Sequence, residues 1–175
     1  MTRKLQNKEL NRLSKNEFLH VDKIPLILVL DNIRSLQNVG SIFRTCDAFR
    51  VEKLCLCGIT GTPPHKELHK TALGADETVT WQYFKSSTEC LTELKKQGYA
   101  LLALEQTSTS IPLQGYQLSG RTVLVLGNEV DGVSEELIGL CDAQLEIPQF
   151  GTKHSLNVAV SAGIAVWELS KQLYK

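Results

Sequence analysis

Three stretches of the sequence combine glycine with side chains that can bind a ligand or move a proton. They read DNIRSLQNVGSIFR at 31–44, LGNEVDGVS at 126–134 and IPQFGTKHSLN at 147–157. Each follows an apolar run of strand length and precedes a segment that should be helical. In open parallel sheets the ligand lies beyond the carboxyl ends of the strands, so these stretches are candidate walls of one site.

The spacing of glycines and histidines argues against several common sites. Neither GxGxxG after the first strand nor GxxxxGK followed by Ser or Thr is present, so a dinucleotide or nucleoside triphosphate site of the usual kind is not supported. GxSxG is missing as well. His65 and His69 could meet on one helix face as metal ligands. However, no third ligand is near in sequence and HKELH is not HExxH, which favours surface histidines over a metal-dependent hydrolase.

The apolar pattern predicts the elements that hold these stretches. Buried strands are predicted at 25–31, 53–58, 99–105, 121–127 and 143–148, and an alternating run indicates another at 77–84. Helical periodicity is present at 38–49, 66–73, 87–98 and 155–173. Strands that alternate with helices predict an α/β fold with a mostly parallel sheet flanked by helices.

The distribution of charge divides the chain into two parts. The 175 residues can bury the core of one domain, and their net charge of zero argues against nucleic-acid binding through a bulk positive field alone. Residues 1–23 nevertheless hold six Lys or Arg against three acids. We therefore expect a basic N-terminal arm at 1–24, either an outer helix or flexible, before the folded domain at 25–175.

Targeting and cysteine signals indicate an intracellular location. No apolar run reaches the ~20 residues that span a bilayer, and the N-terminus lacks the apolar region of a signal peptide. The protein is therefore expected to be soluble and cytoplasmic, with no membrane partner. The five cysteines form no CxxC pair, which indicates reduced core residues rather than disulfides.

In order and spacing, three segments resemble the motifs of the SpoU (TrmH-like) RNA ribose methyltransferases of the SPOUT class. They are Asn38–Arg44, Gly127–Val133 and Ile147–Val158. The resemblance extends over about residues 26–172. It implies a C-terminal deep trefoil knot, S-adenosylmethionine bound in that knot, and a homodimer as the working form. The apolar pattern alone would not predict a knot, because threaded chains are rare.

The resemblance also implies roles for single residues. The cofactor would be bound by Leu104, Glu105, Gly127, Ile147 and Leu156. The catalytic set would be Arg44, Asn38, Glu129, Asn157 and Ser155, and no metal would be needed. Arg44 would lie nearest the ribose 2′-hydroxyl. Arginine effectively never deprotonates in proteins. We therefore expect Arg44 to bind the adjacent phosphate and stabilise the developing alkoxide, rather than to act as a base.

Each of these residues also has a purely structural interpretation. On this interpretation Asn38 and Ser155 are helix caps, and Gly40 is a tolerated helix residue. Gly127 and Gly132 are turn residues, and Glu129 is a solvated loop acid. Likewise, Trp167 is either a dimer anchor or a core residue. Taken together, the structural alternatives do not explain why all three motifs are expected at one edge of the sheet.

The RNA substrate is expected to contact the arm and the dimer face. Candidate contacts are Arg34, Arg50, Lys66, Lys70 and Lys153. The basic extension and the string RTCDAF look most like the tRNA-modifying branch, which gives 2′-O-methylguanosine in the D-loop. Ribosomal RNA is the alternative substrate, followed by another tRNA position. Outside enzymes, the alternative is a catalytically silent, knotted RNA-binding homodimer.

Overall fold

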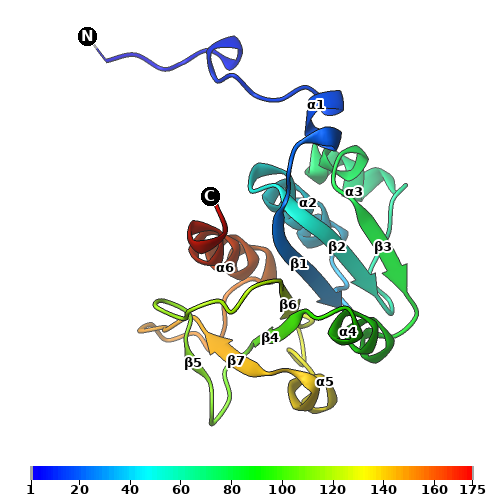
Figure 1. Ribbon diagram of the computed structural model, residues 1–175, viewed down its shortest axis with the longest axis vertical. Helices are drawn as coiled ribbons and strands as arrows, with labels where there is room; N and C mark the ends of the chain where they lie inside the picture. The colour runs from blue at the N-terminus through cyan, green and yellow to red at the C-terminus, as the bar shows by residue number, and fades with distance from the viewer. Residues whose placement is uncertain (1, 175) are drawn as a thin grey trace.

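Seven strands form a single sheet in which every neighbouring pair is parallel (Figure 1). The computed structural model describes residues 2–174. The strands are β1 Ile24–Asp31, β2 Val51–Cys57, β3 Trp81–Phe84, β4 Ala100–Leu104, β5 Ile111–Pro112, β6 Thr122–Leu126 and β7 Ala143–Glu146. Their order across the sheet is β3-β2-β1-β6-β4-β7-β5. The predicted α/β class and parallel sheet are confirmed.

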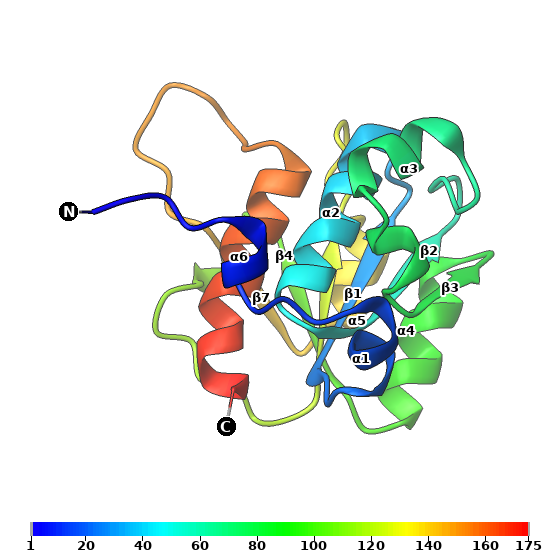
Figure 2. The ribbon, with the colours of Figure 1, turned by 90° about the horizontal axis from the view of Figure 1, so that it is seen from above.

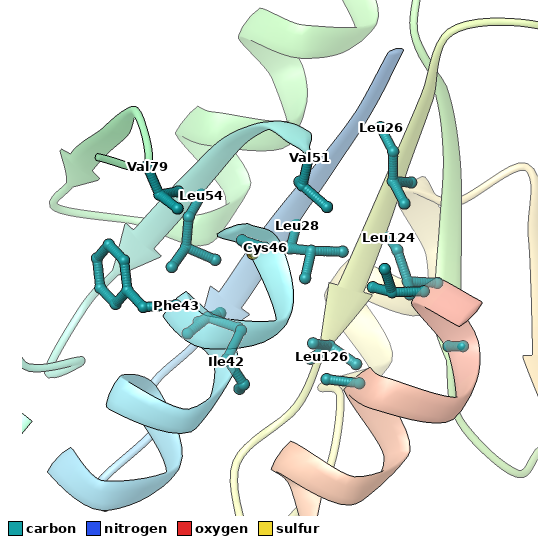
Figure 3. Packing of buried hydrophobic residues seen from close by; sticks show 14 of the residues in the cluster. Leu26, Leu28, Ile42, Phe43, Cys46, Val51, Leu54, Val79, Leu124 and Leu126 are labelled. Atoms are coloured by element: carbon teal, nitrogen blue, oxygen red, sulfur yellow. The ribbon is translucent and has the colours of Figure 1, made fainter. Parts of the chain in front are cut away.

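Helices cover both faces of this sheet, which explains why its central strands read as unbroken apolar runs. One face carries α2 Leu36–Ala48, α3 Lys66–Ala72 and α6 Val158–Leu173, and the other carries α4 Ser87–Lys96 and α5 Glu135–Leu140. Figure 2 shows α2 between α3 and α6. Along β1, Leu28 packs into the first core and Val29 into the second. Figure 3 shows Leu28 together with Ile42 of α2 and Leu124 of β6.

The structure shifts the start of two predicted elements and adds one strand. The last helix begins at Val158 rather than at 155, because the Asn157 side chain accepts hydrogen bonds from the amides of Ala159 (2.9 Å) and Val160 (3.3 Å). The strand predicted at 77–84 is confined to Trp81–Phe84, since the chain first turns through a short 3₁₀ helix, η2 Ala75–Glu77. The two-residue strand β5 was not predicted, because so short a segment has no period to detect.

The N-terminal arm is helical only in part. It contains a 3₁₀ turn, η1 Asn7–Glu9, and one short helix, α1 Lys15–His20. Ser14 and Glu17 form a reciprocal capping box at the start of α1, and Phe18 is buried against the body. The chain before α1 extends away from the sheet (Figure 1).

The cysteines and the helices bear on two further predictions. All five cysteines are free thiols, and Cys55, Cys57 and Cys90 are buried in the second core, as predicted for reduced core residues. In the part of the chain that the structure describes, no helix is both long and apolar enough to cross a membrane.

Candidate functional site

The carboxyl ends of β4, β6 and β7 surround a cavity of about 480 Å³. All five residues predicted to bind the cofactor line it: Leu104, Glu105, Gly127, Ile147 and Leu156. Glu129, Ser155 and Asn157 of the predicted catalytic set line it as well. Two of the three polar stretches therefore converge on one cavity beyond the strand ends, where ligands of parallel sheets bind.

The loop after β6 is a tight structure that requires glycine at two positions. Asn128 and Gly132 exchange backbone hydrogen bonds (3.2 and 3.1 Å), and the Asn128 side chain accepts from the amides of Val130 and Asp131 (both 2.9 Å). Gly132 lies in the left-handed region at φ +67°. A Cβ on Gly127 would lie 2.0 Å from the carbonyl carbon of Gly132. These residues are thus more than ordinary turn glycines.

Glu105 fixes this loop from the neighbouring strand. Its carboxylate accepts hydrogen bonds from the backbone amides of Val133 (2.9 Å) and Gln106 (3.0 Å). The Gln106 side chain in turn donates to the carbonyl of His154 (3.0 Å) and so ties down the loop between β7 and α6. Neither Gln106 nor Asn128 was identified from the sequence, although both directly follow a predicted site residue.

Glu129 connects the second motif to the first. Its two carboxylate oxygens accept hydrogen bonds from the amides of Arg34 (3.1 Å) and Ser35 (3.2 Å) and from the side chain of Asn38 (2.9 Å). The Asn157 side chain donates to the Oδ1 atom of Asn38 (3.1 Å). One polar chain, Glu129–Asn38–Asn157, therefore unites residues from all three motifs.

The observed helix caps are not the residues that the purely structural interpretation proposed. Ser35, and not Asn38, is the N-cap of α2, because its hydroxyl accepts from the Asn38 amide (3.2 Å). Asn157, and not Ser155, caps α6. Gly40 is also more than a tolerated helix residue, since a Cβ there would lie 2.6 Å from the carbonyl oxygen of Leu68 in α3.

The environment of Glu129 favours its charged form. Burial raises its pKa, but the hydrogen bonds from Asn38 and from the amides of Arg34 and Ser35 together lower the pKa by more. The net pKa lies below the ordinary value, so Glu129 is a carboxylate at neutral pH. It is an acceptor that orients neighbours, and not a proton donor.

The lining of the cavity is acidic. Four carboxylate residues face it, namely Glu105, Glu129, Asp131 and Glu146, and among its lining residues in the described chain none is basic. Apolar side chains, including Leu126 and Leu145, complete the wall. A cavity of this kind suits a ligand that is partly apolar and carries positive charge, and it repels phosphate.

Arg44 lies outside this cavity in its own chain. It is six residues beyond Asn38 on α2, which places it roughly 9 Å along the helix axis and on another side of the helix. Its exposed side chain lines a second cavity, between α2 and the N-terminal arm, and the two cavities have no lining residue in common. The first motif is therefore split: Asn38 joins the polar chain, and Arg44 does not.

The predicted RNA contacts and the histidines lie on the surface. Arg34, Lys66, Lys70 and Lys153 are exposed, and Arg50 is half-buried. His65 accepts a hydrogen bond from the amide of Glu67 (3.2 Å) as the N-cap of α3, whereas His69 pairs with Asp76 (2.9 Å). Within residues 2–174, no three metal-binding side chains gather at one place.

Helix α6 exposes one apolar stripe. Val160, Ile164 and Trp167, spaced by four and three residues, are 52%, 39% and 57% exposed. Trp167 touches the Phe49 ring edge-on at 5.9 Å between centroids. The interpretation of Trp167 as a core residue is therefore wrong.

Known proteins resemble this chain over most of its length. Residues 25–167 match the SpoU rRNA Methylase family. A tRNA (guanosine(18)-2'-O)-methyltransferase of Aquifex aeolicus is 32% identical over 94% of this chain and 77% of its own length. A 23S rRNA (guanosine-2'-O-)-methyltransferase of Neisseria meningitidis is 34% identical over 85% of this chain and 59% of its own length.

Solved structures show the same fold. The A. aeolicus TrmH/SpoU tRNA modifying enzyme superposes with a TM-score of 0.81 at 31% identity, over 94% of this chain and 82% of that one. An AdoMet-bound rRNA methyltransferase from Sinorhizobium meliloti has a TM-score of 0.80 at 27% identity, over 94% of this chain and 62% of that one. The expectation of a knot accords with these SpoU neighbours.

Proposed function

We propose a guanosine of tRNA as the substrate of this chain, which belongs to the SpoU rRNA Methylase family. Membership makes the chain an S-adenosylmethionine-dependent RNA 2′-O-ribose methyltransferase that acts on tRNA or rRNA. The cavity at the strand ends is the observation that carries the assignment as a methyltransferase. It gathers every predicted cofactor residue beside the polar chain Glu129–Asn38–Asn157.

The acidic cavity fits the methyl donor. S-adenosylmethionine supplies a methyl group that is bonded to a positively charged sulfur. The same molecule also contains a flat, largely apolar adenine base. The apolar walls formed by Leu104, Ile147 and Leu156 would hold the base, and the carboxylates would favour the cationic end. The absence of a Cβ on Gly127 lets the backbone of Gly132 and Val133 pack against it, and this compact loop would present backbone groups to the adenosine.

The polar chain orients groups around the reacting hydroxyl. A ribose 2′-hydroxyl is a weak acid, so the site must align it with the methyl group and stabilise the charge that develops on its oxygen. Asn38 and Asn157 are held by each other and by Glu129, so their free hydrogen-bonding positions are fixed before the substrate arrives. Ser155, at the wall of the same cavity, would contact the substrate or Arg44.

Arg44 would bind the RNA rather than the methyl donor. Its guanidinium keeps its proton, so we assign it the task of gripping the phosphate next to the target ribose and stabilising the developing alkoxide. Arg44→Lys should lower turnover about 100-fold, because an ammonium cannot reproduce the bidentate contact. A variant that kept most of its turnover would disprove the bidentate role.

A second copy of the chain would bring Arg44 to the donor. Within one chain Arg44 and the donor cavity lie apart, and the exposed stripe of Val160, Ile164 and Trp167 on α6 offers an apolar surface for a homodimer. The site would then combine the donor cavity of one subunit with Arg44 of its partner.

Mixed dimers test this composite site. Arg44→Ala and Asn157→Ala chains should each be inactive as homodimers. After they are mixed and allowed to exchange subunits, about a quarter of wild-type activity should return, because half of the dimers then contain one intact composite site. If activity stays absent although exchange is demonstrated by mass spectrometry, Arg44 works on the donor cavity of its own chain.

The choice of tRNA over rRNA rests on the basic N-terminal arm and on the string RTCDAF. Identity does not separate the two, at 32% and 34%. The basic arm offers a surface for a small folded RNA, and the string RTCDAF looks most like the tRNA-modifying branch. Ribosomal RNA remains the second candidate because of the 34% identity with the Neisseria protein.

The substrate can be identified directly. Nucleosides from total tRNA and rRNA of a strain that lacks this protein should lack one 2′-O-methylguanosine in tRNA, as measured by mass spectrometry. The purified protein should restore that modification with S-adenosylmethionine. Loss of the modification from rRNA instead would establish the second candidate. Binding of donor and RNA without any methyl transfer would indicate a silent RNA-binding protein.

A further inference from the structure

The second cavity, of about 740 Å³, lies between the N-terminal arm and the body. Asn11–Lys15 and Phe18 form its outer wall. The inner wall comes from the second half of α2, including Arg44 and Asp47, and from the turn that follows α3. The cavity is thus built from two parts of the sequence, and it is not a shallow feature of one loop.

This cavity gathers unpaired guanidinium groups. Three of the six arginines of the chain, Arg12, Arg44 and Arg50, line it, and none of the three forms an ion pair with another residue in 2–174. By contrast, Arg3 and Arg121, which lie elsewhere, pair with Glu9 and Glu52.

The other charged groups of the cavity do not neutralise this excess. Asp47 is the single carboxylate residue in the lining, and it accepts a hydrogen bond from the Thr78 hydroxyl (2.8 Å). Lys15 is already paired with Glu77. Uncompensated like charges within one cavity repel each other, and an anion that enters relieves the repulsion.

Both flanking arginines are attached to ordered parts of the chain. Arg12 directly precedes the segment anchored by the Ser14 capping box, by the Lys15–Glu77 ion pair and by buried Phe18. Arg50 forms the turn between α2 and β2 with φ +50°, and its guanidinium lies 5.8 Å from the centre of the Tyr174 ring. Ordered parts of the chain therefore bring Arg12 and Arg50 to the cavity that Arg44 lines.

We propose that the cavity between the arm and α2 binds the phosphodiester backbone of the RNA substrate. Arg12 and Arg50 contact phosphates on either side of the nucleotide whose ribose 2′-hydroxyl is methylated. A guanidinium matches a phosphate through two parallel hydrogen bonds, and a row of phosphates needs a row of such groups. The inference rests on the proposed function, and it assigns recognition to two residues outside the reaction itself.

The test compares three single variants in the full-length chain. Arg12→Ala removes one expected phosphate contact, and Arg50→Asn removes the other while keeping a residue that tolerates a positive φ. Lys96→Ala is the control, since it removes an exposed cation of α4, on the other face of the sheet, that does not line the cavity. The dissociation constant for a tRNA transcript is measured at several salt concentrations, together with KM for methyl transfer and the affinity for S-adenosylmethionine.

The expected result is a selective loss of RNA affinity. Arg12→Ala and Arg50→Asn should each weaken RNA binding about tenfold and lower the slope of log K against log salt by about 0.7–0.9, the change expected for one lost phosphate contact. Lys96→Ala should leave both quantities at the wild-type values. Affinity for the methyl donor should be unchanged in all three variants.

Failure of this inference differs from failure of the proposed function. If the wild type methylates RNA and both variants keep its affinity and salt slope, the cavity does not bind the backbone. If the variants become monomeric in sedimentation at unchanged RNA affinity, the cavity is a protein interface, and the inference is likewise overturned. If the wild type transfers no methyl group but binds RNA through Arg12 and Arg50, only the proposed function fails.

Discussion

Replacement of Gly127 by alanine tests how closely the donor cavity is packed. A Cβ at this position would lie 2.0 Å from the carbonyl carbon of Gly132 and 2.1 Å from the amide nitrogen of Val133. Both are backbone atoms, and the Asn128–Gly132 hydrogen bonds and the Glu105–Val133 hydrogen bond hold them in place. The added methyl group therefore forces the loop away from the end of β6.

The cost of that displacement follows from the contacts that break. Overpacking in a tight site costs about 1–3 kcal/mol, and each hydrogen bond that is lost adds about 1 kcal/mol. We expect Gly127→Ala to lower the free energy of unfolding by about 3 kcal/mol and to weaken S-adenosylmethionine binding by at least about tenfold. Urea denaturation and titration calorimetry measure the two quantities.

A matched control separates this effect from the general effect of an added methyl group. Gly139 lies in helix α5, and a Cβ there would have nothing within 4 Å. Gly139→Ala should therefore bind the donor normally and be as stable as the wild type, or more stable by up to about 1 kcal/mol. If Gly127→Ala matched this control in stability and donor affinity, the close approach of the loop to Gly127 would be refuted.

Three further predictions concern charge and assembly. Because the pKa of Glu129 is lowered in the folded chain, the stability advantage of the wild type over Glu129→Gln in urea should be complete above pH 4.5, its ordinary value, and should fade below it. An advantage that grew on acidification would contradict the hydrogen bonds from Asn38 and the backbone. The hydrogen bond that the His69 ring donates to Asp76 raises the pKa of His69, so the stability advantage over His69→Ala should be complete below pH 6.5 and be lost as the pH rises above it. The opposite trend would mean that the pair does not form in solution. Trp167→Ser should shift the protein toward monomer in sedimentation equilibrium without altering its circular dichroism, and a variant that stayed dimeric would show that the stripe on α6 is not the interface.

The fold could be predicted where one local signal was enough. The runs around Leu28 and Val125 are apolar on every residue, which predicts strands covered on both faces, and the structure buries both side chains completely. The start of the last helix could not be predicted in this way. Ser155 and Asn157 are both good caps, and the choice of Asn157 is accompanied by its contact with Asn38, which lies 119 positions away in the sequence.

The structure brings together the residues expected to bind the cofactor more completely than the expected catalytic set. Glu105, Gly127 and Ile147 stand at the carboxyl ends of predicted strands, and in a parallel sheet these ends share one edge. Arg44 lacks this constraint, because α2 runs back along the sheet and carries it away from the edge that holds Asn38. Sequence spacing therefore placed both residues in one motif without showing that Asn38 bonds to residues of the first cavity whereas Arg44 lines the second.

The separation of the two cavities has a physical reason that the sequence does not display. If the carboxylates and the guanidinium groups lined one cavity, they would form ion pairs with each other. Neither set would then have free charge with which to attract a cationic donor or a phosphate. In this chain Glu105 and Glu146 face one cavity while Arg12 and Arg50 face another, so each set keeps its charge. The net charge of zero therefore conceals an acidic cavity and a basic one, and a homodimer that apposed them would align a cationic donor with a polyanionic acceptor.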